Sequence, residues 1–183
     1  MQNTDTRIQV TKSMFQRAML ELLEEKPVGS VTVKELCERA GLNRGTFYLH
    51  YSEPIDVLHE LETVARNLVM SSAGGGFYKD LPDLLAAIRE NSRLISVVIS
   101  HNGDPAFLRR VRDEEFERSD PKLLKRFPGS KPENIRLAFD FLFSGSTGAI
   151  TAWLQEKVPE PTDQFEKRLS LLVESVFNTI QVM

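Results

Sequence analysis

The sequence predicts an all-α protein in which a three-helix helix-turn-helix domain precedes a larger C-terminal helical domain. Through most of the chain, apolar residues recur at the three- and four-residue spacing that gives a helix one buried face. Capping residues, glycines and prolines interrupt this pattern where helices are expected to begin and end. The 183 residues are enough for a small domain and a larger one.

The N-terminal domain is predicted from local signals. An apolar helix over residues 7–25 comes first. Thr32 and Glu35 then form a capping box, in which each side chain satisfies a backbone amide at a helix start. This short helix stops at Gly41, since glycine most easily adopts the left-handed backbone that follows a helix. Asn43 can cap the next helix, and two short helices joined by such a turn form a helix-turn-helix.

Two long helices are expected to follow. Ser52 can cap the first at about Glu53, and the sequence SSAGGG at 71–76 ends it because glycine disfavours helix. The second carries apolar residues at helical spacing from Leu81 to Ile99 and ends at the turn-forming pair that follows.

Three more helices complete the prediction. Asp104 and Pro105 start a short, charge-rich helix by a side-chain cap and a first-turn proline. Residues 119–132 contain three prolines and one glycine and are predicted to form a loop. The last two helices carry wide apolar stripes over residues 135–154 and 165–180.

Residues 32–51 resemble the DNA-binding end of TetR-family transcriptional regulators, and the helix over 7–25 stands where that family has its first helix. The resemblance covers roughly the first 65 residues. The matching residues are Thr32, Val33, Ala40, Gly41, Leu42, Gly45, Thr46, Phe47, Tyr48, His50 and Tyr51, followed by an acidic helix with Leu58.

The resemblance implies a DNA-binding transcriptional regulator. Its simplest form is a cytoplasmic repressor that binds a pseudo-palindromic double-stranded DNA operator as a homodimer. A small apolar or amphipathic effector would release it. Residues 1–52 would then form the DNA-binding domain, and residues 53–183 the ligand-binding and dimerisation domain.

Candidate DNA contacts lie on and beside the second short helix. The planar guanidinium of Arg44 fits the O6 and N7 atoms of guanine, with a phosphate contact as the alternative. Thr46 suits a thymine methyl group or a phosphate. By resemblance, Tyr48 and His50 donate to phosphates, whereas Phe47 packs in the core. The predicted DNA-binding residues are Thr32, Lys34, Asn43, Arg44, Gly45, Thr46, Tyr48 and His50.

The resemblance also implies a dimer in which the last two helices pair with their symmetry mates, and a small-molecule site between the DNA-binding end and this bundle. For every residue below, packing within one chain is the alternative. The predicted interface residues are Phe139, Leu142, Gly145, Ala149, Trp153, Phe165, Leu169, Leu172, Val173, Val176 and Phe177. The predicted ligand-lining residues are Tyr78, His101, Phe107, Phe116, Phe139, Phe143 and Trp153.

Other functional classes find little support. His50, His59 and His101 are not spaced like a metal site, and no HExxH, CxxC, GxSxG or GxxxxGK[ST] motif occurs. We therefore expect no catalytic residue, metal or cofactor. No apolar run approaches the roughly 20 residues that span a bilayer. The polar N-terminus lacks a signal-peptide core, and a single cysteine fits a reducing cytoplasm.

Charge leaves one alternative open. Seven basic and six acidic residues in 1–50 give this segment a net charge of +1. Phosphate contacts supply most non-specific DNA affinity, so a near-neutral domain predicts modest binding of this kind. Many relatives carry a lysine where this chain has Ser52-Glu53-Pro54. The alternative is a helical regulatory protein that acts through a protein partner, with weak or no DNA binding of its own. Activation also stays open beside repression.

Overall fold

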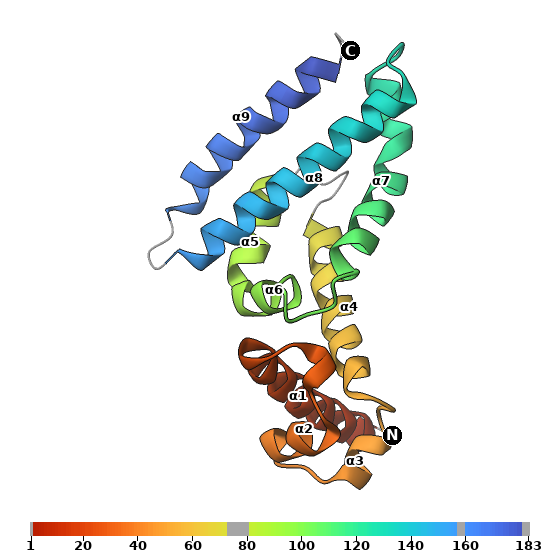
Figure 1. Ribbon diagram of the computed structural model, residues 1–183, viewed down its shortest axis with the longest axis vertical. Helices are drawn as coiled ribbons and strands as arrows, with labels where there is room; N and C mark the ends of the chain where they lie inside the picture. Colours follow the sequence, from red (N-terminus) through yellow and green to blue (C-terminus); the bar gives the residue numbers. More distant parts are fainter. Residues whose placement is uncertain (1, 73–80, 157–159, 181–183) are drawn as a thin grey trace. The chain divides into compact units, whose positions relative to one another are not determined.

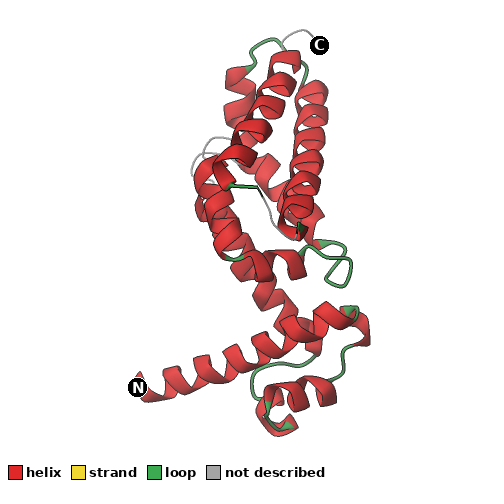
Figure 2. Cartoon of the chain, turned by 90° about the vertical axis from the view of Figure 1, so that its left-hand side faces the viewer, coloured by secondary structure: helices red, strands yellow, loops and turns green. Residues whose placement is uncertain are grey.

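A computed structural model describes residues 2–72, 81–156 and 160–180, and all regular structure within these ranges is helical (Figures 1 and 2). The all-α prediction is therefore confirmed. None of the described helices combines the length and apolarity needed to cross a membrane. The elements are α1 (Gln2–Glu25), the 3-10 turn η1 (Val28–Ser30), α2 (Val33–Ala40), α3 (Arg44–Tyr48), α4 (Pro54–Ser72), α5 (Leu81–Glu90), α6 (Ser92–Val98), α7 (Phe107–Arg126), α8 (Pro132–Gln155) and α9 (Thr162–Ile180).

The chain folds into two compact units. The first comprises residues 1–66 and 93–107, and the second comprises residues 67–92 and 108–183. The boundary predicted after residue 52 lies inside the first unit, because the first three turns of α4 bury apolar side chains there.

Two hydrogen bonds fasten the segment 93–107 to the end of α1. The amide of Val28 donates to the carbonyl of Asn102 at 2.8 Å, and the side-chain amide of Asn102 donates to the carbonyl of Leu23 at 2.9 Å. Arg93 adds an ion pair with Glu24. This segment therefore belongs to the N-terminal unit although it is distant in sequence.

The local signals for α2 act as predicted. The hydroxyl of Thr32 accepts a hydrogen bond from the amide of Glu35, whose carboxylate accepts from the amide of Thr32 at 3.0 Å. Gly41 follows the helix with a φ of 69°, in the left-handed region. The capping box and the glycine stop are confirmed.

The start of α4 differs from the prediction. The carboxylate of Asp56 accepts hydrogen bonds from the amides of both Ser52 and Glu53, each at 2.8 Å. These two bonds lower the pKa of Asp56. An acid of the first helical turn thus holds the two residues that precede the helix, which begins at Pro54. The helix ends at Ser72, and the glycines at 74–76 lie outside the described residues.

The long helix predicted from Leu81 to Ile99 is two helices, α5 and α6. The interruption is at Asn91, whose side-chain amide donates to the carbonyl of Ala87 at 2.9 Å. Apolar spacing continues on both sides of Asn91, so periodicity alone could not mark this break.

The loop predicted over residues 119–132 is also wrong in its first half. Helix α7 continues to Arg126 with Pro121 inside it, although proline removes a helical hydrogen bond. Burial beyond the proline favours the helix, since Leu123 and Phe127 are buried and Phe127 stacks on Phe177. The chain then turns at Gly129, which has a φ of 104°.

In the second unit α8 lies alongside α9, which also contacts α5 (Figure 1). Trp153 of α8 is almost fully buried, and its ring stacks on Phe165 with centroids 4.7 Å apart. The indole nitrogen donates to the carbonyl of Glu160 at 3.0 Å, so burial leaves its polar atom satisfied. The guanidinium of Arg89 lies 5.0 Å from the ring centroid.

We predict that Gly41→Ala lowers the free energy of unfolding by about 1 kcal/mol, because a residue with a Cβ disfavours the left-handed backbone. No atom lies within 4 Å of the added Cβ, so the cost would come from the backbone alone. Gly41→Asn should lose less, since asparagine tolerates this region better. Urea unfolding measures both variants, and equal losses would contradict the backbone explanation.

Candidate nucleic-acid interface

The second helix of the helix-turn-helix, α3, will be called the reading helix. Asn43 caps it: the side-chain oxygen accepts from the amide of Thr46 at 2.8 Å and from its hydroxyl at 3.2 Å. A Cβ at Gly45 would lie 3.1 Å from the same oxygen of Asn43. Glycine at this position therefore leaves room for the cap.

Phe47 anchors the reading helix. Its side chain is fully buried and is the only buried one in α3. The ring makes an edge contact with Phe15 of α1 at 5.5 Å and a tilted contact with Tyr51 at 5.6 Å. The predicted core role of Phe47 is confirmed, and its contacts fix which side chains of the helix face outward.

A polar network holds Tyr51, which follows the reading helix. The hydroxyl of Tyr51 donates to Glu60 of α4 at 2.7 Å, and Gln16 of α1 donates to the same carboxylate oxygen at 3.1 Å. Lys12 forms an ion pair with Glu60 and lies over the ring of Tyr51. Burial, and then the bond to Glu60, raise the pKa of Tyr51, so the phenol keeps its proton and donates.

The outward side chains form the candidate contact surface. Arg44, Gly45 and Tyr48 are exposed, while Thr46 and His50 are partly buried. Leu49, which the sequence analysis did not select, is 79% exposed directly after the reading helix. An apolar residue beside a predicted core position is easily taken for core, and only the structure separates the two.

Thr32 and Lys34, at the start of α2, are exposed. The hydroxyl of Thr32 is engaged in the capping box and also donates to Glu35 at 2.7 Å. The ammonium of Lys34 lies 3.8 Å from Glu38, in a loose pair. Lys34 can therefore turn toward another anion at little cost.

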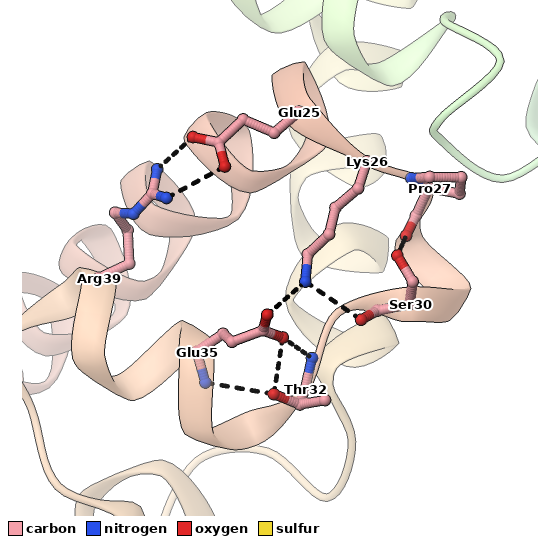
Figure 3. Close-up of polar contacts among 7 residues, drawn as sticks. All are labelled: Glu25, Lys26, Pro27, Ser30, Thr32, Glu35 and Arg39. Carbon is pink, nitrogen blue, oxygen red and sulfur yellow. Dashed lines mark hydrogen bonds and ion pairs between the residues drawn. The ribbon is translucent and has the colours of Figure 1, made fainter.

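Several basic side chains of the first unit are engaged within it (Figure 3). Lys26 contacts Glu35 at 2.6 Å, and Arg39 forms two hydrogen bonds with Glu25, at 2.9 and 3.2 Å. Arg44 is exposed and makes no ion pair with any described residue. Its charge is thus available for a ligand.

The start of α4 offers less to a phosphate than the sequence suggested. Asp56 already occupies the amides of Ser52 and Glu53, and its carboxylate brings negative charge to this position. Glu53 is exposed as well. Both features oppose an anion there, so any phosphate contacts depend on other residues of the unit.

The residues predicted to line one ligand site belong to both units. Tyr78 lies outside the described residues. His101, which is exposed, and Phe107 belong to the first unit. The others belong to the second unit, where Phe139 makes an edge contact with Phe116 and stacks on Phe143. Trp153 instead stacks on Phe165 of α9.

The residues predicted for the dimer interface fall into a buried group and a more exposed group. One chain by itself buries Phe139, Leu142, Trp153, Phe165, Leu169, Val173 and Phe177. Gly145 and Leu172 are exposed, and Ala149 and Val176 are partly buried. Three apolar side chains that the sequence analysis did not select are exposed on the same helices: Leu137, Phe141 and Leu171.

Two family models match the chain. The model described as "Bacterial regulatory proteins, tetR family" matches residues 17–56, which include α2 and α3. The model described as "Transcriptional regulator C-terminal region" matches residues 77–175, more than half of the chain. No curated protein sequence matches significantly.

Solved structures agree over nearly the whole length. A TetR transcriptional regulator from Streptococcus agalactiae 2603V shows 26% identity and a TM-score of 0.69, with 94% of this chain and 98% of that chain covered. A putative TetR-family transcriptional regulator from Syntrophomonas wolfei shows 16% identity and a TM-score of 0.67, with 92% of this chain and 95% of that chain covered. The dihydroxyacetone kinase operon activator DhaS shows 14% identity and a TM-score of 0.59, with 94% of this chain and 97% of that chain covered. The last two support the fold alone.

We predict that acid weakens this unit partly through Glu35. Hydrogen bonds from Lys26, and then from Thr32, lower the pKa of Glu35 from 4.5 to about 2. Since the folded-state pKa is depressed, the carboxylate stabilises the fold above about pH 4.5, and this contribution is lost as the pH falls toward 2.

Glu35→Gln tests this prediction because glutamine can keep the capping box but does not titrate. The unfolding midpoint of the variant, measured from pH 5 to pH 2, should fall less steeply than that of the wild type. Glu38→Gln is the matched control, since its carboxylate is exposed and lies 3.8 Å from Lys34. Equal slopes for Glu35→Gln and the wild type would contradict the assignment.

Proposed function

This chain belongs to the TetR family of bacterial transcriptional regulators, and from that premise we propose that it binds a pseudo-palindromic DNA operator as a homodimer. In this proposal it represses transcription there and is released by a small-molecule effector. The observation that carries the proposal is the reading helix, held by buried Phe47, whose free cation Arg44 is exposed.

Base reading is assigned to the exposed side of the reading helix. Arg44 is the candidate for a paired contact to the O6 and N7 of guanine in the major groove. Thr46 and Leu49 offer methyl groups that suit contact with the methyl of thymine. Leu49 supports this role because a leucine that is 79% exposed contributes little to the fold.

Phosphate contacts are assigned to the flanking polar groups. Tyr48, which is 60% exposed, and His50 have donors near the end of the reading helix. Lys34 and the side-chain amide of Asn43 add donors at the starts of α2 and α3. Such contacts position a protein on the duplex without reading its sequence.

A dimer through α8 and α9 is supported by apolar side chains that one chain leaves exposed. Leu137 and Phe141 of α8 are 60% and 66% exposed, and Leu172 of α9 is 64% exposed. On α8, Leu137, Phe141, Gly145 and Gly148 follow one another at intervals of four, four and three residues. This spacing places all four on one face of the helix.

The two glycines give this face a second property. A Cβ added at Gly145 or Gly148 would meet no atom within 4 Å, so packing within the chain does not require glycine at either position. Glycine also weakens a helix. Close approach by a partner helix would explain why glycine stands at both positions, because small residues let two helix backbones pack closely.

The effector is proposed to be small and amphipathic. A partly open pocket of about 270 Å³ lies between α7 and α8 in the second unit, slightly smaller than the roughly 300 Å³ at which small-molecule sites begin. Phe143 and Leu108 supply its apolar wall, while Arg109 supplies a cation. This combination suits an apolar molecule with an anionic group. Among the predicted ligand-lining residues that the structure describes, only Phe143 lines this pocket.

A second candidate function is action through a protein partner with weak DNA binding. The observation that favours it is Asp56, which fills the amides at the start of α4 where a phosphate would otherwise bind. Activation is the alternative to repression. DhaS, which has this fold, is named as an operon activator.

We predict that Arg44→Ala lowers operator affinity by about 1–3 kcal/mol and relaxes the preference at one base position. The measurement is a selection from random duplex DNA at stated salt, followed by titration of the enriched site. Arg44→Lys is the matched variant, since it keeps the charge but loses the planar fork. Weaker binding with an unchanged preference would reassign Arg44 to a phosphate. No enrichment by a folded dimer would favour the partner-dependent function.

We also predict that Phe141→Glu and Leu172→Glu each shift the protein toward monomers. Both side chains are exposed within one chain, so the fold should survive while a buried charge opposes association. Sedimentation velocity measures the oligomeric state, with the exposed substitution Glu174→Lys as the control on α9. Dimers that persist in both variants would place the interface elsewhere.

A further inference from the structure

The pocket between α7 and α8 is lined by matching sides of the two helices. Three of its described lining residues come from the first two turns of α7 and three from the middle of α8: Leu108, Arg109, Arg112, Phe143, Ser144 and Thr147. Within each helix the three residues follow one another at intervals of one and then three positions. This spacing keeps them on one side of each helix, so two ordered surfaces face the pocket.

We propose that this pocket binds a small monocarboxylate. The guanidinium of Arg109 and the hydroxyls of Ser144 and Thr147 would hold the carboxylate, while the apolar part would lie against Leu108 and Phe143. The proposal rests on the proposed function, since it names the chemical class of the effector.

Arg109 is the cation that the pocket offers to a ligand. Its side chain is exposed and forms no ion pair with any described residue. A planar guanidinium can donate two parallel hydrogen bonds to one carboxylate, and such charge-assisted bonds are about twice as strong as neutral ones. A carboxylate is therefore the anion that fits this side chain without further cations.

Arg112, the other arginine of the pocket, is engaged by acids. Its guanidinium donates to Asp113 at 3.1 and 3.2 Å and lies 3.4 Å from the carboxylate of Asp140 on α8. Arg136 donates to the same two acids at 2.8 and 3.0 Å, so two cations face two anions. The positive charge left over is that of Arg109. It suits a monoanion better than a phosphate monoester, which carries between roughly 1.5 and 2 negative charges at neutral pH.

Two hydroxyls of α8 add donors on the opposite side of the pocket. Ser144 is exposed and Thr147 is partly buried. Thr147 accepts a bond from Thr151 at 2.8 Å through its backbone carbonyl, but neither hydroxyl bonds to a described residue. Residues three apart on a helix lie side by side, so both hydroxyls can donate to one carboxylate.

The apolar wall and the volume limit what accompanies the carboxylate. Phe143 is 4% exposed and stacks on Phe139, so its ring is held in place. Leu108 is partly buried. The volume of about 270 Å³ lies below the roughly 300–1,000 Å³ of sites for drug-sized ligands. Both features favour an acid with a short alkyl chain or a single ring.

The position of the pocket along the chain suits a regulatory ligand. Phe107, the first residue of α7, is buried and belongs to the first unit, whereas Leu108 and Arg109 belong to the second. A ligand that draws Arg109 toward α8 therefore acts on the helical turn that begins in the first unit. The segment 93–107, which ends there, is hydrogen-bonded to the end of α1.

Isothermal titration of the full chain with benzoate, and separately with hexanoate, tests the proposal. We expect one molecule per chain for at least one of the two acids. The matching amide, benzamide or hexanamide, has nearly the same shape without the charge. It should bind at least about tenfold more weakly, because the charge-assisted bonds to Arg109 are lost. Phenyl phosphate should also bind more weakly than the acid.

Arg109→Gln should lower the affinity for the acid by at least about tenfold, and the fold should survive because the side chain is exposed. Arg109→Lys should lose less, since lysine keeps the charge without the planar fork. Lys125→Gln is the matched control: it removes one exposed positive charge from the last turn of the same helix and should leave the affinity unchanged.

Three results would each overturn the proposal. They are no saturable binding of either acid by the wild type, wild-type affinity in Arg109→Gln, and tighter binding of phenyl phosphate than of the acid. No DNA is present in these titrations, so a failure of operator binding would not change their result.

Discussion

The burial of Phe47 is the contact on which the DNA-binding end depends. The reading helix has five residues, too few to be stable in isolation. Its orientation comes from the ring of Phe47, which is closed in by Phe15 and Tyr51. Tyr51 is in turn bonded to Glu60, so α1, α3 and α4 meet at a single aromatic cluster. The direction in which Arg44 points is therefore set by apolar packing behind it.

The near-neutral charge of this unit follows from the same construction. Lys12, Lys26 and Arg39 form ion pairs that connect α1 with α4 and α2, and are thus engaged inside the protein. Each such pair contributes at most about 1 kcal/mol, but together they fix the arrangement of short helices. The structural use of these cations leaves fewer positive charges for DNA, and Arg44 is an exposed cation that forms no ion pair with any described residue.

The sequence predicted features set by neighbouring residues, including the capping box of Thr32, the stop at Gly41 and the cap by Asn43. It was wrong at Pro121, where distant packing decides and burial beyond the proline extends α7. It was also wrong at Asn91, where a side-chain bond to Ala87 accompanies a break in a continuous apolar pattern. Periodicity found the apolar faces of α8 and α9 but could not separate the core of one chain from a surface between chains. Phe139 and Phe141 are two positions apart, and only the first is buried.

The single buried side chain of the reading helix has an evolutionary consequence. Because folding uses Phe47 and leaves Arg44 and Leu49 exposed, substitutions at those two positions would change the surface of the reading helix and its end without repacking the core. Stability and operator preference can then diverge independently among descendants of a duplicated gene. In a regulator that reads DNA through this exposed surface, one or two mutations there can change the target site with little effect on folding.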